Sequence, residues 1–225
     1  MSGSSTAWRA PAFAVILAGV TGVCGDRAVN GEPGAPWVPK SPRFEKPQGA
    51  LMADDFSRPG LAGWRADQNG VWKVVNGMLR AHLPDKPQQR SVLRAGGTGW
   101  TDYAVDVDVC MTRGVDKGFA VRVQEDDGVG VDLRGPGYDD VLLQRGWSRL
   151  GHAAVPNANG VWQHLRVEAR GAQYRVFVNG RQLIEAEDGE SDRGGIAMAA
   201  YTGGLGKCTV YYDNLVVTPL AAARR

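Results

Sequence analysis

Alternation of apolar and polar residues, punctuated by glycine, is the feature that most constrains this 225-residue chain. Residues 103–109 read YAVDVDV, so their apolar side chains fall on one strand face and Asp106 and Asp108 on the other. Two further runs end in Asn76-Gly77 and Asn179-Gly180, and Asn-Gly pairs tolerate the positive φ angles of a tight hairpin turn. Residues 51–220 show almost no 3.6-residue periodicity. The pattern therefore predicts strands joined by turns, which also explains the 31 glycines.

Short strands recur along this region with turn residues between them. Such spacing without crossover helices predicts an all-β fold of two antiparallel sheets packed face to face. A closed barrel is the alternative that the same pattern allows. The predicted strands are 71–75, 78–83, 103–109, 119–123, 129–133, 141–144, 162–169, 174–178, 181–185, 196–201 and 208–217.

The N-terminal part of the chain has a different character. One positive charge, Arg9, precedes a short apolar run at 11–20 and then small residues, which predicts an export signal at 1–24. Cys24 allows a second interpretation, a lipoprotein signal with lipid attached to this cysteine, although Val23 fits that signal poorly. The Pro- and Gly-rich residues 25–49 are typical of an extended linker. We therefore expect one domain at 50–219 and a tail at 220–225.

This organisation predicts where the protein works. An exported domain is expected in the periplasm, on the cell surface or outside the cell, with a lipid at Cys24 as its only membrane contact. A net charge of +2 gives no sign of nucleic-acid binding. A mean hydropathy of −0.27 excludes a polytopic membrane protein. Three cysteines are too few for a disulfide-framework mini-protein.

Several segments resemble one known fold family. Residues 160–168 (GVWQHLRVE) and 174–180 (YRVFVNG) resemble the tryptophan strand and following hairpin of concanavalin A-like jelly-roll domains, the laminin G-like group. Residues 54–56, 194–198 and 212–217 resemble the opening, penultimate and closing strands of that family. The subgroup most similar to this chain is the secreted bacterial domain called 3-keto-disaccharide hydrolase. The resemblance covers residues 50–219.

The resemblance implies a two-sheet antiparallel jelly-roll β-sandwich that handles a saccharide or cell-surface glycan. It implies a glycoside hydrolase of the 3-keto-disaccharide type or a glycan binder. The alternative is a non-catalytic laminin G-like adhesion or structural module. Two departures leave the catalytic residues unassigned. The subgroup often carries Leu-Gln-x-His-Gly where residues 199–203 read AAYTG, and the E-x-D-x-E strand of related retaining glucanases is absent.

The resemblance also implies that the saccharide lies on a concave sheet face, which the strands within 119–144 are expected to help form. Outward arginine and carboxylate side chains there can hydrogen-bond sugar hydroxyls, and aromatic rings can stack on sugar faces. Solvated charges on a half-exposed sheet are the alternative interpretation. The predicted sheet residues are Arg122, Gln124, Asp132, Arg134 and Gln144, with Tyr138, Trp147, Tyr201 and Trp100 at the rim.

Metal and disulfide sites are less clearly marked. The three histidines are scattered and show no metal-binding or triad spacing. The resemblance implies a structural Ca²⁺ held by Asp213 with Asp54 or Asp55. It also places the strands of Cys110 and Cys208 side by side, so an exported protein is expected to form a disulfide there. Simple alternation, however, puts the two cysteines on opposite faces, and free thiols are the alternative.

Overall fold

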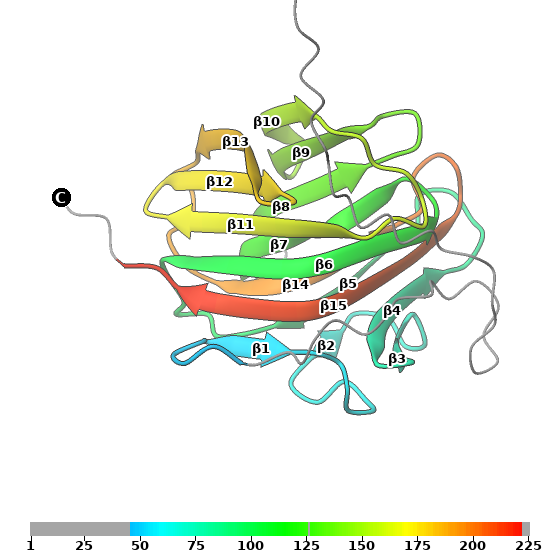
Figure 1. Cartoon of the computed structure of the whole chain (residues 1–225), viewed down its shortest axis with the longest axis horizontal. Coiled ribbons are helices and arrows are strands. Elements are labelled where there is room, and N and C mark those ends of the chain that lie inside the picture. Colours follow the sequence, from blue (N-terminus) through cyan, green and yellow to red (C-terminus); the bar gives the residue numbers. More distant parts are fainter. Residues whose placement is uncertain (1–45, 126, 222–225) are drawn as a thin grey trace, which may run out of the picture.

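The computed structural model describes residues 46–125 and 127–221, which form two antiparallel sheets stacked face to face (Figure 1). The predicted all-β jelly-roll sandwich is confirmed. The export signal, Cys24, nearly all of the predicted linker and the last tail residues lie outside the described residues. No helix within the described ranges is long and apolar enough to cross a membrane.

The eight-stranded sheet lies in front in Figure 1 and contains the longest strands. β1 (Met52–Asp54) pairs with the last strand, β15, off the main path of this sheet. Along that path the order is β13 (Arg181–Glu187), β12 (Gln173–Val178), β11 (Gln163–Arg170), β6 (Tyr103–Arg113), β15 (Cys208–Pro219), β4 (Met78–Leu83) and β3 (Trp72–Val75).

The seven-stranded sheet lies behind and carries the meander in which the sequence places the site. Its β7–β8–β9 strands occupy one half and β14 and β5 the other. The order is β10 (Ser148–Ala154), β9 (Asp140–Arg145), β8 (Asp127–Arg134), β7 (Asp116–Gln124), β14 (Gly195–Tyr201), β5 (Arg90–Ala95) and β2 (Arg65–Ala66).

Tight turns formed by Asn-Gly pairs set the strand register. Asn76 and Gly77 have φ angles of 54° and 75°, and Asn179 and Gly180 have 51° and 78°. These positive angles match the right-handed twist of the flanking strands, so the two predicted hairpins β3–β4 and β12–β13 form.

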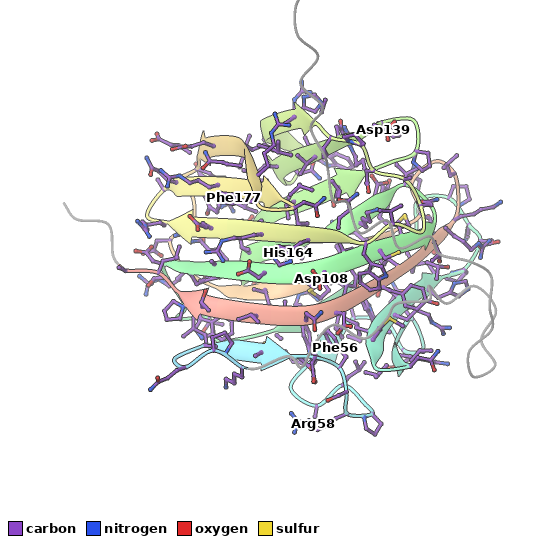
Figure 2. The ribbon with its side chains drawn as sticks, in the orientation of Figure 1. Phe56, Arg58, Asp108, Asp139, His164 and Phe177 are labelled. Carbon is purple, nitrogen blue, oxygen red and sulfur yellow. The ribbon has the colours of Figure 1, made fainter. Side chains whose placement is uncertain are left out.

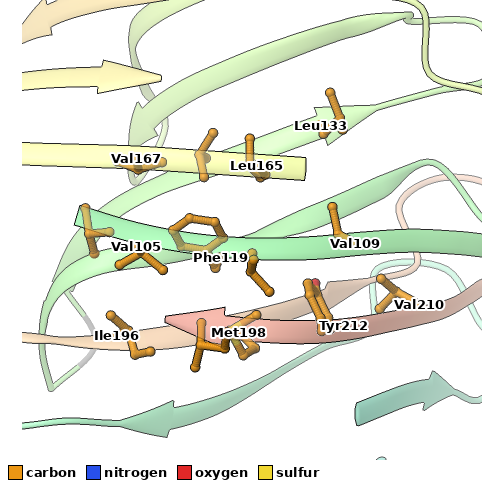
Figure 3. Close-up of a cluster of buried hydrophobic side chains, with 14 of the residues drawn as sticks. Val105, Val109, Phe119, Leu133, Leu165, Val167, Ile196, Met198, Val210 and Tyr212 are labelled. Carbon is orange, nitrogen blue, oxygen red and sulfur yellow. The ribbon is translucent and has the colours of Figure 1, made fainter. Parts of the chain in front are cut away.

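The core fills the space between the sheets (Figure 3). Inward positions of β6 and β11, such as Val105 and Val167, are fully buried against Phe119 and Met198 of the other sheet. Burial of each such side chain contributes about 1.5–3 kcal/mol to folding. Because every second residue is committed to this core, the other half of each strand is free to carry polar chemistry.

A bulge in β7 overturns one sequence prediction. Alternation places Arg122 on the outer face, but the pairing of β7 with β8 shifts between Val121 and Gln124. Arg122 has a φ of 53° and only 1% of it is exposed. A bulge inserts an extra residue, so side chains beyond it change faces. The prediction that Arg122 faces a saccharide is therefore wrong.

The guanidinium of Arg122 instead connects the two sheets. Its Nη1 donates to the carbonyl oxygens of Gly171 (2.5 Å) and Ser191 (2.9 Å), and its Nη2 lies 3.4 Å from Asp102. The guanidinium also stacks over the Tyr174 ring at 5.2 Å. These groups belong to the eight-stranded sheet and its loops, so one buried side chain holds the edge of the sandwich together.

The predicted disulfide is not formed. Both Cys110 and Cys208 are buried thiols. Cys110 pairs with Tyr211 and Cys208 with Leu83, and only Cys208 belongs to the inter-sheet core. The two side chains therefore occupy different faces of the eight-stranded sheet, as simple alternation indicates.

Replacing Arg122 tests its structural role. We expect Arg122→Met to lower the free energy of unfolding by about 3 kcal/mol, because buried carbonyl oxygens and Asp102 lose their donor. Arg181→Met, at an exposed position of β13, is the control and should change stability by less than about 0.5 kcal/mol. Urea denaturation measures both, and equal stability of the two variants would contradict the assignment.

Candidate functional site

The outward residues of β5, β14, β7, β8 and β9 lie in three levels across the outer face of the seven-stranded sheet. Strand register defines each level, because directly paired residues point to the same face. The first level contains Arg90, Tyr201, Asp116, Arg134 and Asp140. The second contains Val92, Ala199, Gly118, Asp132 and Leu142, and the third contains Arg94, Ala197, Ala120, Gly130 and Gln144.

The middle of this face has almost no side chains. We call the outward residues Gly118, Ala120, Gly195, Ala197 and Ala199 of β7 and β14 the small-residue strip. Longer side chains flank it on both sides: the β5 arginines on one, and those of β8 and β9 on the other. Because its floor is backbone and methyl groups, a flat ligand can lie close to the sheet.

Two carboxyl groups lie beside one end of the strip. Asp132 sits diagonally across the β7–β8 ladder from Asp116, a separation of roughly 7–8 Å between the backbones. Burial raises the pKa of Asp132 from 3.8 to about 7, and the nearby Asp116 charge raises it further. Arg90 and Arg134 oppose this shift, as does the hydrogen bond from Gln144 Nε2 at 2.9 Å.

Asp116 shares this environment. Burial raises the pKa of its carboxyl as well, with Arg134 opposing and Asp140 adding to the shift. With a pKa of about 7, the Asp132 carboxyl is partly protonated at neutral pH, and the Asp116 charge beside it favours the protonated form. Such a pair is able to remove one proton and donate another.

A charged cluster fixes Arg134 beside the pair. The Asp140 carboxylate accepts from Arg134 Nε at 2.8 Å and Nη2 at 2.5 Å. His152 Nε2 lies 3.0 Å from the same carboxylate, and the Tyr138 ring lies 4.6 Å from the Arg134 guanidinium carbon. A two-point contact of this kind holds the guanidinium in one orientation.

The sequence-predicted residues separate into three groups. Asp132, Arg134, Gln144 and Tyr201 are brought together on this face, and the Tyr201 hydroxyl donates to Gln88. Tyr138 and Trp147 are exposed loop aromatics, with 59% and 99% of their surface accessible, and Tyr138 contacts the site through Arg134. Arg122, Gln124 and Trp100 take no part: Gln124 binds the carbonyl of Arg193, and Trp100 packs against Tyr103.

Sequence reasoning missed Asp116, Arg90 and Arg94. The sequence pattern does not predict a strand at 90–95, so its two outward arginines are not among the predicted site residues. The sequence does contain one indication of their position: Arg90 and Arg94 are four residues apart, so in a strand both lie on the same face. Asp116 opens β7 immediately before the predicted 119–123 strand.

The described residues do not support the predicted calcium site. Asp54 accepts from the Phe56 amide and from Trp64 Nε1, and Asp55 accepts from Ser57. Within residues 46–125 and 127–221, no group of three or more His, Cys, Asp or Glu side chains is placed to hold a metal, so Asp213 gains no such ligand set.

The opposite face of the sandwich carries polar side chains that bind one another, among them His164 and Asp108 (Figure 2). His164 lies 2.8 Å from Asp108 and 3.2 Å from Asp106, and these bonds raise the pKa of His164 to about 9. Arg166 binds Asp106 and Glu168. These charges already satisfy one another, so the seven-stranded sheet is the better candidate for ligand binding.

Comparison with known families adds an independent observation. Residues 56–218 match the family described as the 3-keto-α-glucoside-1,2-lyase-like domain. The chain belongs to this family. The match spans most of the chain and both sheets of the sandwich. No curated protein matches the chain in sequence.

Solved structures with the same fold share little sequence with the chain. The carbohydrate-binding module CBM66 from Bacillus subtilis has a TM-score of 0.60 at 18% identity, covering 69% of this chain and 95% of its own. A galectin-like protein of unknown function from Bacillus subtilis has a TM-score of 0.62 at 12% identity, with coverages of 79% and 99%. LamA from Z. galactanivorans, solved as E269S with laminaritriose and laminaritetraose, has a TM-score of 0.58 at 11% identity, with coverages of 76% and 98%. At these identities the likeness establishes the fold alone.

The raised pKa of Asp132 predicts a pH-dependent stability. A carboxyl that binds its proton more tightly in the folded chain makes the free energy of unfolding fall as pH rises from about 4 to about 7. Asp132→Asn should flatten this fall, leaving a smaller slope from Asp116. Glu187→Gln, at an exposed position of β13, should follow wild type. Denaturation at successive pH values measures the slopes, and unchanged slopes in Asp132→Asn would contradict the prediction.

Proposed function

We propose that this domain cleaves 3-keto-glucosides by elimination across C1 and C2 on the outer face of the seven-stranded sheet. Asp132 and Asp116 are the proton-transfer pair in this proposal. The observation that carries it is the placement of these two partly buried carboxyls on the outer sheet face, between Arg90 on one side and Arg134 on the other. Family membership supplies the substrate class.

The chemistry needs only proton transfers. A ketone at C3 makes the neighbouring C2 proton acidic, so a carboxylate can remove it. The C2–H electrons form an enolate with C3, and the enolate then forms the C1–C2 double bond as the C1–O bond breaks. The departing oxygen takes a proton from the second carboxyl group. The products are a conjugated 3-keto sugar and the free alcohol, and neither water nor an oxidant is consumed.

The residues of the face fit these steps. Because the pair can hold one proton, one carboxyl is available as the base while its neighbour serves as the acid. Arg134 is fixed by Asp140, and Arg90 lies across the strip, so a guanidinium is available to stabilise the enolate oxygen. Flat sugar rings can lie along the small-residue strip between them.

The departure from the subgroup's histidine motif is consistent with this assignment. Thr202 stands where the motif has histidine, and it is buried. Its hydroxyl binds the backbone of Lys86 and Gln89, so it supports a loop. A carboxyl pair takes the proton-transfer role that an imidazole would otherwise be able to fill.

Glycan binding without turnover is the second candidate function. The side chain of Trp147 is 99% exposed at the β9–β10 turn, and an exposed indole is a good platform for a sugar ring. In that case the carboxyl pair and arginines would serve as hydrogen-bonding groups only.

We also propose that the domain is exported, because residues 1–24 have the pattern of an export signal.

A chromogenic substrate tests the proposed function. We expect the full chain to release nitrophenol from nitrophenyl 3-keto-α-glucoside, with an enone product visible by its ultraviolet absorbance. The unoxidised nitrophenyl α-glucoside should be inert, because its C2 proton is not acidic. Asp132→Asn should lower kcat by about 100-fold or more.

The controls separate the two functions. Asp192→Asn should keep wild-type kcat, and circular dichroism should show that both variants fold. Wild-type activity in Asp132→Asn would remove this residue from the mechanism. Binding of the keto-glucoside without turnover by wild type would establish the binding function instead.

A further inference from the structure

Gln144 of β9 contacts Asp132 from the side of the sheet away from the small-residue strip. Its Nε2 donates to Oδ2 of Asp132 at 2.9 Å. Asp132 pairs with Leu142 in the β8–β9 ladder, so Gln144 stands two residues beyond the directly opposite position. The strip lies on the other side of Asp132, with Gly118 of β7 as its direct partner. The hydrogen bond therefore reaches the carboxylate from the β9 side, opposite the strip.

Gln144 can reach this diagonal neighbour because the residue directly opposite it is glycine. Its partner in the ladder is Gly130, which has no side chain. A Cβ atom at Gly130 would meet one atom of the described residues within 4 Å, the Gln144 carbonyl oxygen at 3.8 Å. Diagonal positions of neighbouring strands lie within reach of a long side chain. The open space above Gly130 thus allows the Gln144 side chain to lie toward Asp132.

The two oxygens of the Asp132 carboxylate have different surroundings. Oδ2 accepts the Gln144 amide hydrogen, whereas no group in the described part of the chain donates to Oδ1. Asp132 is partly buried, yet Oδ1 is not among the enclosed side-chain oxygens without a partner, so it keeps contact with solvent. A proton on Oδ2 would face the amide hydrogens of Gln144 Nε2. Proton exchange at Asp132 is therefore directed to Oδ1.

This hydrogen bond also makes the carboxyl pair asymmetric. Asp116 receives no hydrogen bond from the residues that the structure describes. A donor favours the charged form of a carboxyl group, so the Gln144 amide opposes the effects of burial and of the Asp116 charge on Asp132. Arg90 of β5 and Arg134 of β8 act in the same direction through their charge, whereas Gln144 is in direct contact with the carboxylate.

We propose that Gln144 is the positioning residue of Asp132 in the proton transfer. Its amide holds Oδ2 and leaves Oδ1 as the oxygen that exchanges a proton with the sugar. The identity of the proton transfer rests on the proposed function, whereas the control of Asp132 by Gln144 does not. Gln144 then acts on the saccharide through Asp132, in place of the direct contact expected from the sequence.

Carbon-13 NMR of the full chain tests this role, because the carboxyl carbon of Asp132 reports its protonation directly. The loss of one signal in Asp132→Asn assigns it. In wild type this signal should titrate with a pKa of about 7. Gln144→Met removes the donor and should move the midpoint to higher pH by about one pH unit, the size expected for a hydrogen bond to a charged group.

Two further variants make the result specific. Gln144→Lys places a positive charge beside the carboxylate and should move the midpoint to lower pH, opposite to Gln144→Met. Gln182→Met is the matched control, since Gln182 Nε2 donates to the Glu185 carboxylate at 3.0 Å on the other sheet. It should leave the Asp132 midpoint unchanged.

An unchanged midpoint in Gln144→Met, with circular dichroism showing that the variant is folded, would overturn the proposal. If Gln144→Met does not fold, an unchanged midpoint in Gln144→Lys has the same meaning.

Turnover of the keto-glucoside separates this proposal from the proposed function. The pH at which kcat is half-maximal should move with the NMR midpoint in both Gln144 variants. A lower kcat with an unmoved pH profile would indicate a structural effect only and would contradict the positioning role. A shifted midpoint in a protein without turnover at any pH would count against the proposed function alone and leave the control of Asp132 by Gln144 in place.

Discussion

The buried guanidinium of Arg122 is the interaction on which the geometry of this sandwich depends. It comes from β7 of the seven-stranded sheet and binds Gly171 and Ser191 in the connections of the other sheet. β7 bulges at this residue, and the bulge turns Val123 to the outer face beside Gly195. The bulged residue therefore holds the two layers together at this edge, and the residue after it lies on the outer face.

Much of the fold could be predicted from sequence because its strongest signals are local. Strict alternation in 103–109 predicts a strand with one buried face, and Asn76-Gly77 predicts a hairpin. Both predictions depend only on neighbouring residues. Bulges are different, since the sequence around Arg122 continues to alternate through the shift. A bulge whose side chain binds carbonyl groups of distant residues therefore cannot be predicted from the local alternation of residues.

The candidate site was only half predictable for a related reason. Asp132, Arg134 and Gln144 lie on strands with clear alternation, so their outward position followed directly. The pattern of β5 is inverted: Ser91 is buried and binds Trp72 Nε1 and Asp67, while Val92 belongs to the outer face. A polar residue inside and an apolar residue outside conceal the strand, and Arg90 and Arg94 with it.

The small-residue strip has a consequence for how this face can discriminate between ligands. Glycine and alanine have no rotamers to lose, so a floor built from them costs almost no side-chain entropy when it is covered. Ordering on binding then falls mainly on the ligand and on the flanking arginines. In the proposed complex, a single methylene added at Ala197 would contact one sugar ring only. A substitution in the strip can therefore change the selectivity for one sugar ring, while the charged side chains that flank the strip stay unchanged.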